Sequence, residues 1–304
     1  MRLRFFTAVF TAFIILVFCS NARAADCSST CSGGLRSASP LEGGGIENLY
    51  DQQQEGVSPF NAELRLGGLY DSRVGSTSGV SGDEDWALAA ALTTGWQAPL
   101  KGPVGVRVDY RGYMDLHQDF HEFNLIDQIL SLEPQYKAGQ LIYSLPLSFN
   151  VTMENGERDY NRYGASPTLT YLIPDTRQAV SVFGIVARND YKKKNSYNNY
   201  YNDGVSWGGG CAYLYIFENK SRVRLSLNYQ QTTYDADRVW QYQSTSDFSE
   251  KRKEEAIAAG LDILLPITDH FGLYVNYAFI HSNSNVDLYE YDRHLAGVGL
   301  ELKF

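Results

Sequence analysis

The sequence predicts an all-β protein in which about twelve antiparallel strands close into a transmembrane β-barrel. Apolar and polar residues alternate with a period of two over many segments of about ten or more residues, against about five or six in ordinary soluble strands. Short and long connections alternate between these segments. Beyond the N-terminal region no apolar run is long enough for a membrane-spanning helix, so any crossing has to be made by strands.

Residues 1–24 have the features of a secretory signal peptide. Two arginines precede an apolar run over residues 5–18, and residues 22–24 form an A-x-A cleavage pattern. The run is too short to span a membrane comfortably. Lipidation at Cys19 is the alternative, but the bulky Phe18 in front of that cysteine disfavours it. We therefore expect an exported protein that is cleaved after residue 24.

The remaining chain divides into two parts. Residues 25–58, rich in Ser, Gly and Gln, predict a flexible periplasmic tether, and residues 59–304 predict the barrel. Loss of the three arginines of the signal changes the net charge from -9 to about -12, which disfavours nucleic acid as a partner. Cys27 and Cys31 could form a disulfide in an oxidising compartment, and Cys211 falls in a strand pattern as a small buried or lipid-facing residue.

The period-two alternation defines each strand in turn. In the first, Ala62, Leu64 and Leu66 share one face, whereas Glu63 and Arg65 share the other. The facing is ambiguous where glycines and mixed polarity interrupt the pattern, in the fourth, seventh and eighth segments. The twelve expected strands start near residues 60, 84, 103, 120, 139, 159, 177, 204, 221, 253, 269 and 291. The sequence holds 22 Tyr, 15 Phe and 27 Gly, a composition that favours strands over helices.

The connections indicate how the barrel is oriented. Tight turns follow the second, fourth, sixth, eighth and tenth strands, with the sequences PLKG, KAGQ, PDTR, ENKS and PITDH. Longer connections include GSTSGVSGDE, KKKNSYNNYYND and DADRVWQYQSTSDFSE. Outer-membrane barrels have short periplasmic turns and longer outer loops. We expect the same arrangement here, with both ends of the barrel on the periplasmic side.

Ionised residues concentrate on the face opposite the apolar one. A lipid-facing arginine at mid-depth costs about 2–4 kcal/mol, so this face should point into the barrel. The predicted lumen-lining residues are Arg65, Arg107, Asp109, Arg111, Arg222, Arg224, Asp262 and Glu301. The arginines could form a selectivity surface for anionic or sugar solutes, or they could pair with acids and plug a narrow lumen. A soluble sandwich or lipocalin-like barrel is the alternative fold, but it would not require such long strands or the alternating connections.

Other candidate chemistry is weaker. His117 and His121 are spaced for a metal if helical, but on strands flanking a turn they suit loop hydrogen bonding, so we expect no metal and no cofactor. His281 is near Ser282 and Ser284 at the expected outer rim, although no acidic residue that could orient it is apparent and no G-x-S-x-G occurs. The lysines at 192–194 would lie in an outer loop, where they could meet lipopolysaccharide phosphates.

Two resemblances to known families follow from these residues. The closing strand, HLAGVGLELKF, resembles the last strand of Gram-negative porin-like outer-membrane barrels, which implies that Phe304 is read by the barrel assembly machinery. ELRLGGLYDSRVG and YRGYMDLHQDFHEFNLIDQILSLEPQY, within residues 63–200, resemble the barrel of surface lipoprotein assembly modifier proteins. Those proteins usually carry tetratricopeptide repeats in front of the barrel, and this chain lacks them.

The function expected from the sequence is a porin-like passive channel for small solutes in the Gram-negative outer membrane, without enzymatic activity. A surface lipoprotein assembly or export barrel is the first alternative, as the second resemblance implies. A hydrolase at the rim, built on His281, is the second alternative. The expected partners are outer-membrane lipid and lipopolysaccharide, the barrel assembly machinery and small solutes, with no nucleic acid.

Overall fold

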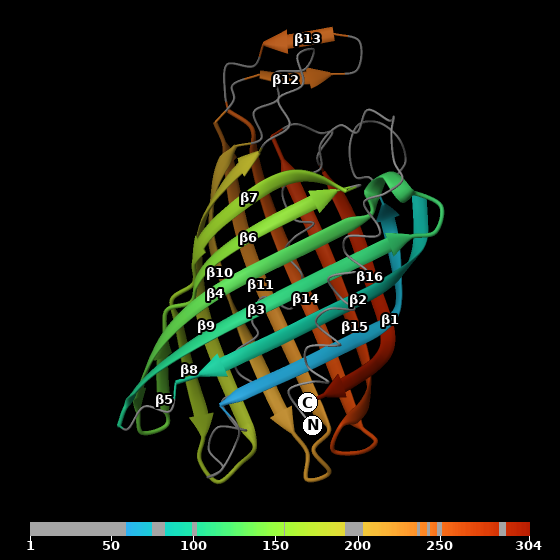
Figure 1. Ribbon diagram of the computed structural model, residues 1–304. Helices are drawn as coiled ribbons and strands as arrows, with labels where there is room; N and C mark the ends of the chain where they lie inside the picture. Colours follow the sequence, from blue (N-terminus) through green and yellow to red (C-terminus); the bar gives the residue numbers. More distant parts are fainter. Residues whose placement is uncertain are drawn as a thin grey trace.

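A computed structural model describes the barrel part of the chain (Figure 1). The described residues are 59–74, 83–98, 102–154, 156–191, 203–235, 238–241, 244–247, 251–285 and 290–304. The predicted signal peptide, the predicted tether with Cys27 and Cys31, and the lysines at 192–194 lie outside these residues. No helix in the described segments is long and apolar enough to cross a membrane.

The described chain is almost entirely β-structure, in line with the predicted fold class. The strands are β1 (Phe60–Val74), β2 (Asp83–Gln97), β3 (Val104–His117), β4 (Leu125–Ala138), β5 (Leu141–Ser144), β6 (Leu147–Glu154), β7 (Glu157–Ala165), β8 (Thr168–Ile173), β9 (Gln178–Tyr191), β10 (Gly204–Ile216), β11 (Arg222–Tyr234), β12 (Arg238–Gln241), β13 (Ser244–Asp247), β14 (Lys253–Pro266), β15 (Phe271–Ser284) and β16 (Tyr291–Lys303). The single 3-10 turn in these segments, η2, spans His121–Phe123.

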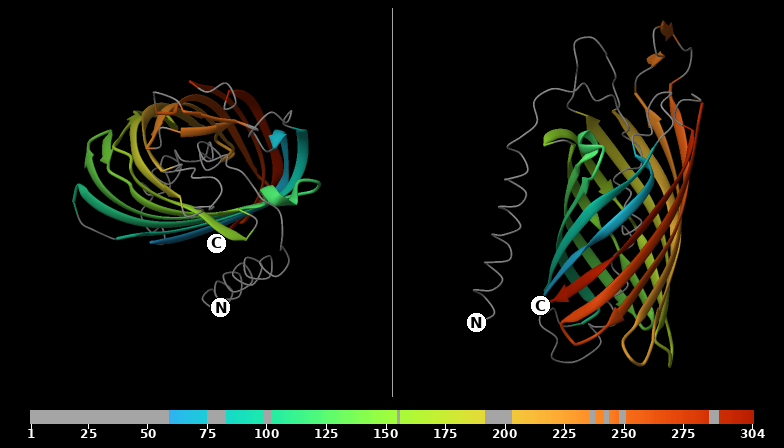
Figure 2. Two further views of the ribbon diagram at one scale, coloured as in Figure 1. Left: turned by 90° about the horizontal axis from the view of Figure 1, so that it is seen from above. Right: turned by 90° about the vertical axis from the view of Figure 1, so that its right-hand side faces the viewer.

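The strands form a closed antiparallel barrel. Strands β12 and β13 pair only with each other, and the other strands belong to one 14-stranded sheet. Within this sheet β5 and β6 are two halves of one wall strand, as are β7 and β8, so the wall has twelve strands, as predicted. Pairing of β1 with β16 from Glu63↔Lys303 to Asp71↔Leu295 closes the ring (Figure 2). The described wall strands therefore leave no sheet edge unpaired in lipid, which cannot supply the hydrogen bonds that water would.

The strand bounds place the connections at two ends of the barrel. Residues 98–103, 139–140, 174–177, 217–221 and 267–270 connect strands at one end of the barrel. Residues 75–82, 118–124, 155–156, 192–203, 235–252 and 285–290 connect strands at the other. The connection at 155–156 is as tight as any turn, so long connections are not uniform at that end. The described chain starts and ends at the same end of the barrel (Figure 1).

The fourth wall strand starts later than predicted. Residues 118–124 form a connection with η2, and β4 begins at Leu125 rather than near residue 120. Side chains accept the backbone N–H groups here that a strand ladder would otherwise use: Asp85 Oδ2 accepts those of Asp119 and Phe120, each at 3.2 Å. Asp115 Oδ1 accepts the N–H of Leu125 at 3.0 Å. Short polar side chains commonly divert the backbone into turns in this way.

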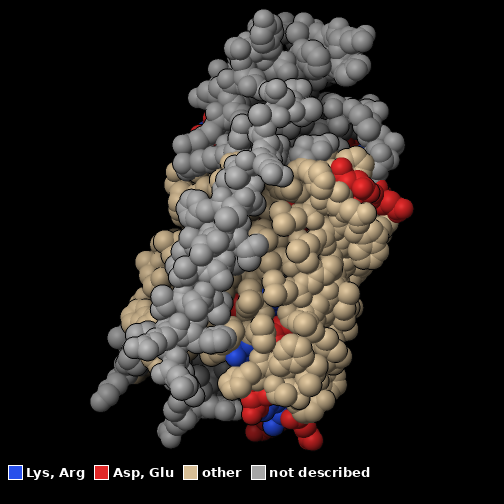
Figure 3. Space-filling model, turned by 45° about the vertical axis from the view of Figure 1, so that its right-hand side comes forward, with Lys and Arg blue, Asp and Glu red and all other residues tan. Residues whose placement is uncertain are grey.

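The two faces of the wall differ as the period-two pattern predicts. Leu130, Leu227 and Val298, each on a different part of the wall, are 53, 51 and 57% exposed. The alternate positions are mostly polar and buried. On the side that Figure 3 shows, charged residues gather mainly at the two ends of the wall, and other residues cover most of its height. An exposed apolar belt of this size suits a lipid environment, not water.

A row of prolines crosses the wall between β4 and β9. The three residues are Pro134, Pro146 and Pro167. Their carbonyls accept the N–H groups of Leu145, Ser166 and Gly184 at 3.1, 2.9 and 2.9 Å. Because proline has no N–H, the reciprocal bond is missing from each of three adjacent strand pairs. The hydroxyl of Thr168 compensates in part by donating to the carbonyl of Ser166 at 2.9 Å. The row explains why two wall strands are interrupted.

Glycines allow close packing where β1 meets β16. Gly67 lies opposite Gly299 on the inner face. A Cβ added at Gly67 would lie 2.3 Å from the carbonyl oxygen of Val298 and 2.5 Å from the hydroxyl of Tyr274. The guanidinium carbon of Arg65 lies 5.5 Å from the centre of the Tyr274 ring. A side chain at position 67 would therefore push apart the strands that close the barrel.

Candidate functional site

Four of the eight residues predicted to line the lumen lie in two groups of ion pairs. Arg107 and Asp109 are both 2% exposed, with Nε–Oδ1 and Nη2–Oδ1 distances of 2.8 and 2.6 Å. Arg65 binds Glu301 Oε2 through Nε at 2.9 Å and through Nη2 at 2.8 Å. Glu63 contacts the same Nε at 2.7 Å, and Lys303 Nζ lies 3.0 Å from Glu301 Oε1. Arg111, another of the eight, lines a cavity described below.

The other three lie together on β11 and β14. Arg224 is 3% exposed and is directly opposite Asp262 in the strand register. Arg222 is opposite Leu264 and is half-buried. Along their strands, the eight residues lie at inward positions between apolar residues that face outward. That they line a water-filled passage stays a prediction.

A further polar group at the other end of the barrel was not predicted from the sequence. The Arg293 guanidinium on β16 donates to Asp71 on β1, from Nε to Oδ1 at 2.9 Å and from Nη2 to Oδ2. Both residues are buried, and the backbone N–H of Arg73 adds a bond of 3.0 Å to Asp71 Oδ1. This bidentate pair joins the first and last strands. The alternation places both residues on the inner face, but no sequence signal indicates that residues so far apart in the chain meet.

The two histidines considered as metal ligands have separate roles. The Nδ1 of His117 lies 3.3 Å from Asp85 Oδ2, and its Nε2 lies 3.9 Å from Asp115 Oδ1. His121 Nδ1 is 2.7 Å from the carbonyl oxygen of His117. In the described segments, no group of three or more His, Cys, Asp or Glu residues could hold a metal ion. His121 is therefore engaged in a turn contact, the loop hydrogen bonding expected from the sequence.

The histidine considered for rim hydrolysis is separated from its serines. His281 lies on β15 with Nδ1 at 2.7 Å from Asp292 Oδ1 on β16, so an acidic partner that the sequence analysis had missed does exist. Ser282, however, is 1% exposed and lies on the opposite face of β15, as does Ser284. Since a nucleophile has to reach the imidazole, these serines cannot form a catalytic pair with His281.

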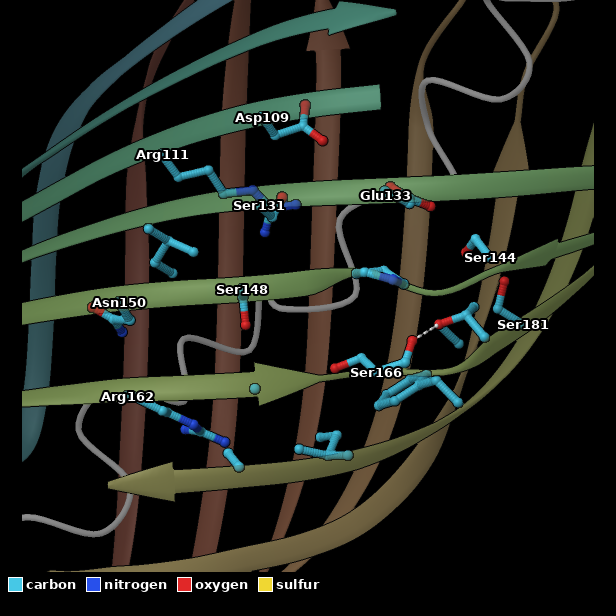
Figure 4. A pocket seen from close by; sticks show the side chains of 18 of the residues that line it. Asp109, Arg111, Ser131, Glu133, Ser144, Ser148, Asn150, Arg162, Ser166 and Ser181 are labelled. Carbon is cyan, nitrogen blue, oxygen red and sulfur yellow. Dashed lines mark hydrogen bonds between the residues drawn. The ribbon is translucent and has the colours of Figure 1, made fainter. Parts of the chain in front are cut away.

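A cavity of about 110 Å³ lies against the inner face of the wall between β3 and β10 (Figure 4). Arg111 and Arg162 border it, together with Asp109, Glu133 and Asn150. Seven of its lining residues carry hydroxyl groups: Ser131, Ser144, Ser148, Ser166, Thr168, Thr170 and Ser181. Of this set, only Arg111 and Asp109 were predicted from the sequence. The row of inward serines on alternate positions was a signal that could have pointed to it.

Arg162 connects the cavity to a hydrogen-bonded chain on the inner wall. Its Nη2 donates to Gln230 Oε1 on β11 at 3.2 Å, across the two intervening strands β9 and β10. The Nε2 of Gln230 donates to Thr232 Oγ1 at 3.3 Å, and that hydroxyl lies 2.9 Å from Ser206 Oγ. Arg162 is 5% exposed. This arginine is thus fixed in position by strands other than its own, which suits a group with a role in recognition.

Two further residues from the sequence analysis lie on the wall. Cys211 is an exposed free cysteine at an outward position of β10, in line with one of the two predicted placements. The N–H of Phe304 donates to the carbonyl of Ala62 at 2.9 Å, so the last residue still extends the pairing with β1. Its role as an assembly signal stays a prediction.

A closed antiparallel wall with an apolar exterior and ionised residues inside defines the class of protein: a β-barrel of the Gram-negative outer membrane. The sequence matches no family model and no curated protein, so the resemblance to surface lipoprotein assembly modifier proteins gains no support.

Solved barrels are similar to the chain at low identity. An outer membrane channel from Pseudomonas putida F1 has 12% identity and a TM-score of 0.49, covering 81% of this chain and 94% of that one. An anion-selective porin from Comamonas acidovorans has 11% identity and a TM-score of 0.43, covering 81% and 98%. The translocator domain of the autotransporter NalP from Neisseria meningitidis has 11% identity and a TM-score of 0.39, covering 88% and 96%. At these sequence identities and TM-scores, the similarities say nothing about what the chain does.

Proposed function

We propose that the barrel is a porin-like passive channel for small solutes, with no enzymatic activity. The observation that supports this most is the inner cavity bordered by Arg111 and Arg162. An apolar plug would have filled this space with large aliphatic side chains, as in the interiors of small filled barrels. Fixed arginines beside a polar passage favour the entry of anions over cations.

The eight residues predicted from the sequence, which include Arg111 and Asp109 of this cavity, would also line the lumen. Arg107 with Asp109, and Arg65 with Glu301, are paired along the wall between residues of the same or adjacent strands. Pairs of this kind keep the ionised side chains close to the wall, which supports a passage beside them. We further propose lipid and lipopolysaccharide as surroundings of the barrel, and the barrel assembly machinery as the reader of Phe304.

Conductance in planar bilayers tests the channel. The purified mature chain should give steady ohmic currents whose reversal potential in a salt gradient reports anion preference. The substitutions Arg111→Gln and Arg162→Gln should each shift that potential toward cation preference. Arg188→Gln is the matched control, because Arg188 is exposed at the outward side of β9 and should leave the potential almost unchanged. Folded protein that carries no ion current would contradict the proposal.

A further inference from the structure

The cavity behind the proline row is a recess built from small hydroxylated residues. Pro146 and Ser166 belong both to the row and to the cavity lining, so the interrupted strands form its back wall. Gly164 lies beside them, where a Cβ would be 3.0 Å from the hydroxyl oxygen of Ser148. Small side chains along an irregular wall leave space for a ligand against the inner face.

The hydroxyl groups of the recess have different roles. Thr170 Oγ1 and Ser181 Oγ lie 2.6 Å apart and satisfy each other. Thr168 donates to the Ser166 carbonyl and thereby stabilises the interrupted strand. Ser131, Ser144 and Ser148 lie on neighbouring strands and border the same cavity, as Figure 4 shows. A hydroxyl group both donates and accepts, so neighbouring serines can match a solute that carries several hydroxyls of its own.

Charged and aromatic groups complete the recess. Glu133 and Asn150 supply acceptors beside the serines, and Arg111 and Arg162 supply donors. The ring of Phe183 adds an apolar surface, held against the backbone of β10 where a Cβ on Gly210 would be 2.7 Å from its tip. An apolar surface beside polar groups that orient the ligand is a usual feature of a small-molecule site.

The size of the recess limits the ligand. A cavity needs about 10–15 Å³ to hold one water, so a cavity of about 110 Å³ can hold several water molecules. A single sugar ring with its hydroxyls displaces about that much water and replaces the hydrogen bonds that the water made. We infer that the recess lined by Ser131, Ser144 and Ser148 binds a polyhydroxylated solute the size of a monosaccharide. This inference deepens the proposed channel function, because it assigns a class of solute to the same lumen.

Isothermal titration calorimetry on the mature chain in detergent tests the inference, with D-glucose as the probe. 1,4-Dioxane is the comparison, because it is a six-membered ring with oxygen acceptors but no hydroxyl donors. Glucose should bind saturably and dioxane should not compete with it. Ser148→Leu fills the recess, and the loss of one or two hydrogen bonds should weaken glucose binding about tenfold. Ser131→Leu serves as a second recess variant should Ser148→Leu not fold.

The matched control is Ser284→Leu, the same change at an inward position at the end of β15, away from the recess. It should bind glucose as the unaltered chain does. Three results would each overturn the inference: no saturable binding of glucose, displacement of glucose by dioxane, or a loss of glucose affinity in Ser284→Leu as large as that in Ser148→Leu. A barrel that conducts ions without binding glucose would leave the channel proposal intact and reject the recess. Glucose binding by a barrel that does not conduct would support the recess and reject the channel.

Discussion

The ion pair between Asp71 and Arg293 should contribute strongly to the stability of the barrel, because it joins the strands that close it. Asp71 is 0% exposed and Arg293 is 8% exposed. Two guanidinium nitrogens bind the two carboxylate oxygens, and the backbone N–H of Arg73 occupies a further acceptor site. Substitution of Asp71 by Asn preserves the shape of the side chain but leaves the Arg293 cation buried without its counter-ion.

The size of this effect follows from burial. Removing one partner of a buried, well-bonded pair typically costs about 3–5 kcal/mol, because the other charge stays desolvated and unpaired. An exposed pair contributes only about 0–1 kcal/mol, since water solvates each partner nearly as well. The chain offers an exposed comparison in Arg188 and Asp235, whose side chains are 47% and 42% exposed. We expect Asp71→Asn to lower the free energy of unfolding by about 3–5 kcal/mol, and Asp235→Asn by less than about 1 kcal/mol.

Urea unfolding of the barrel in lipid vesicles measures both values. Tryptophan fluorescence reports the transition, and linear extrapolation gives the free energy in water. The double variant Asp71→Leu/Arg293→Met should recover most of the loss, because it removes both charges and leaves apolar groups of similar size. The reasoning is refuted should Asp71→Asn cost no more than Asp235→Asn.

Three more predictions concern the seam, the outer face and one turn. Gly67→Ala should lower the free energy of unfolding by about 1–3 kcal/mol in the same urea assay, because its Cβ overlaps backbone across the seam; an unchanged value would show that the strands are looser there. Leu227→Arg should lower the free energy of unfolding by about 2–4 kcal/mol, and the same change at Phe217, which is similarly exposed but lies in a turn, by about 0–1 kcal/mol; equal costs would place both outside the hydrocarbon. A hydrogen bond of 2.9 Å from Lys220 holds the pKa of the exposed Asp269 carboxyl below its usual range. The small stabilisation from this pair is therefore lost as the pH falls through that lowered pKa. An NMR titration of the carboxyl group should show a higher pKa for Asp269 in the variant Lys220→Met.

The wall of the barrel was predictable from the sequence because a strand in lipid has two very different faces. Alternation in segments such as residues 296–304 decides both that a strand forms and which side of it faces outward. Turn sequences such as KAGQ and PDTR then separate the strands, and the twelve segments follow. The predicted start of β4 was wrong because the carboxylate of Asp85, on another strand, accepts hydrogen bonds from the backbone N–H groups of residues 119–120. A contact of this kind leaves no signal in the local sequence.

The candidate site was less predictable because it depends on which inward residues meet. Arg111 is recognisable on β3 alone, but the serines that share its cavity lie on strands paired through the register of the whole sheet. The bridge from Arg162 to Gln230 crosses two strands, and the pair of Asp71 and Arg293 depends on closure of the ring. His281 shows the converse case: its serine neighbours in sequence lie on the other face of the strand.

The most direct test of the account is the folding of the purified mature chain with and without an amphiphile. Circular dichroism and electrophoretic mobility before and after heating report whether a compact barrel has formed. The account predicts a β-sheet spectrum and heat-sensitive migration in detergent micelles or lipid vesicles, and aggregation in buffer alone, because the outer belt is apolar. A folded, monomeric protein that stays dissolved in buffer without any amphiphile would contradict it.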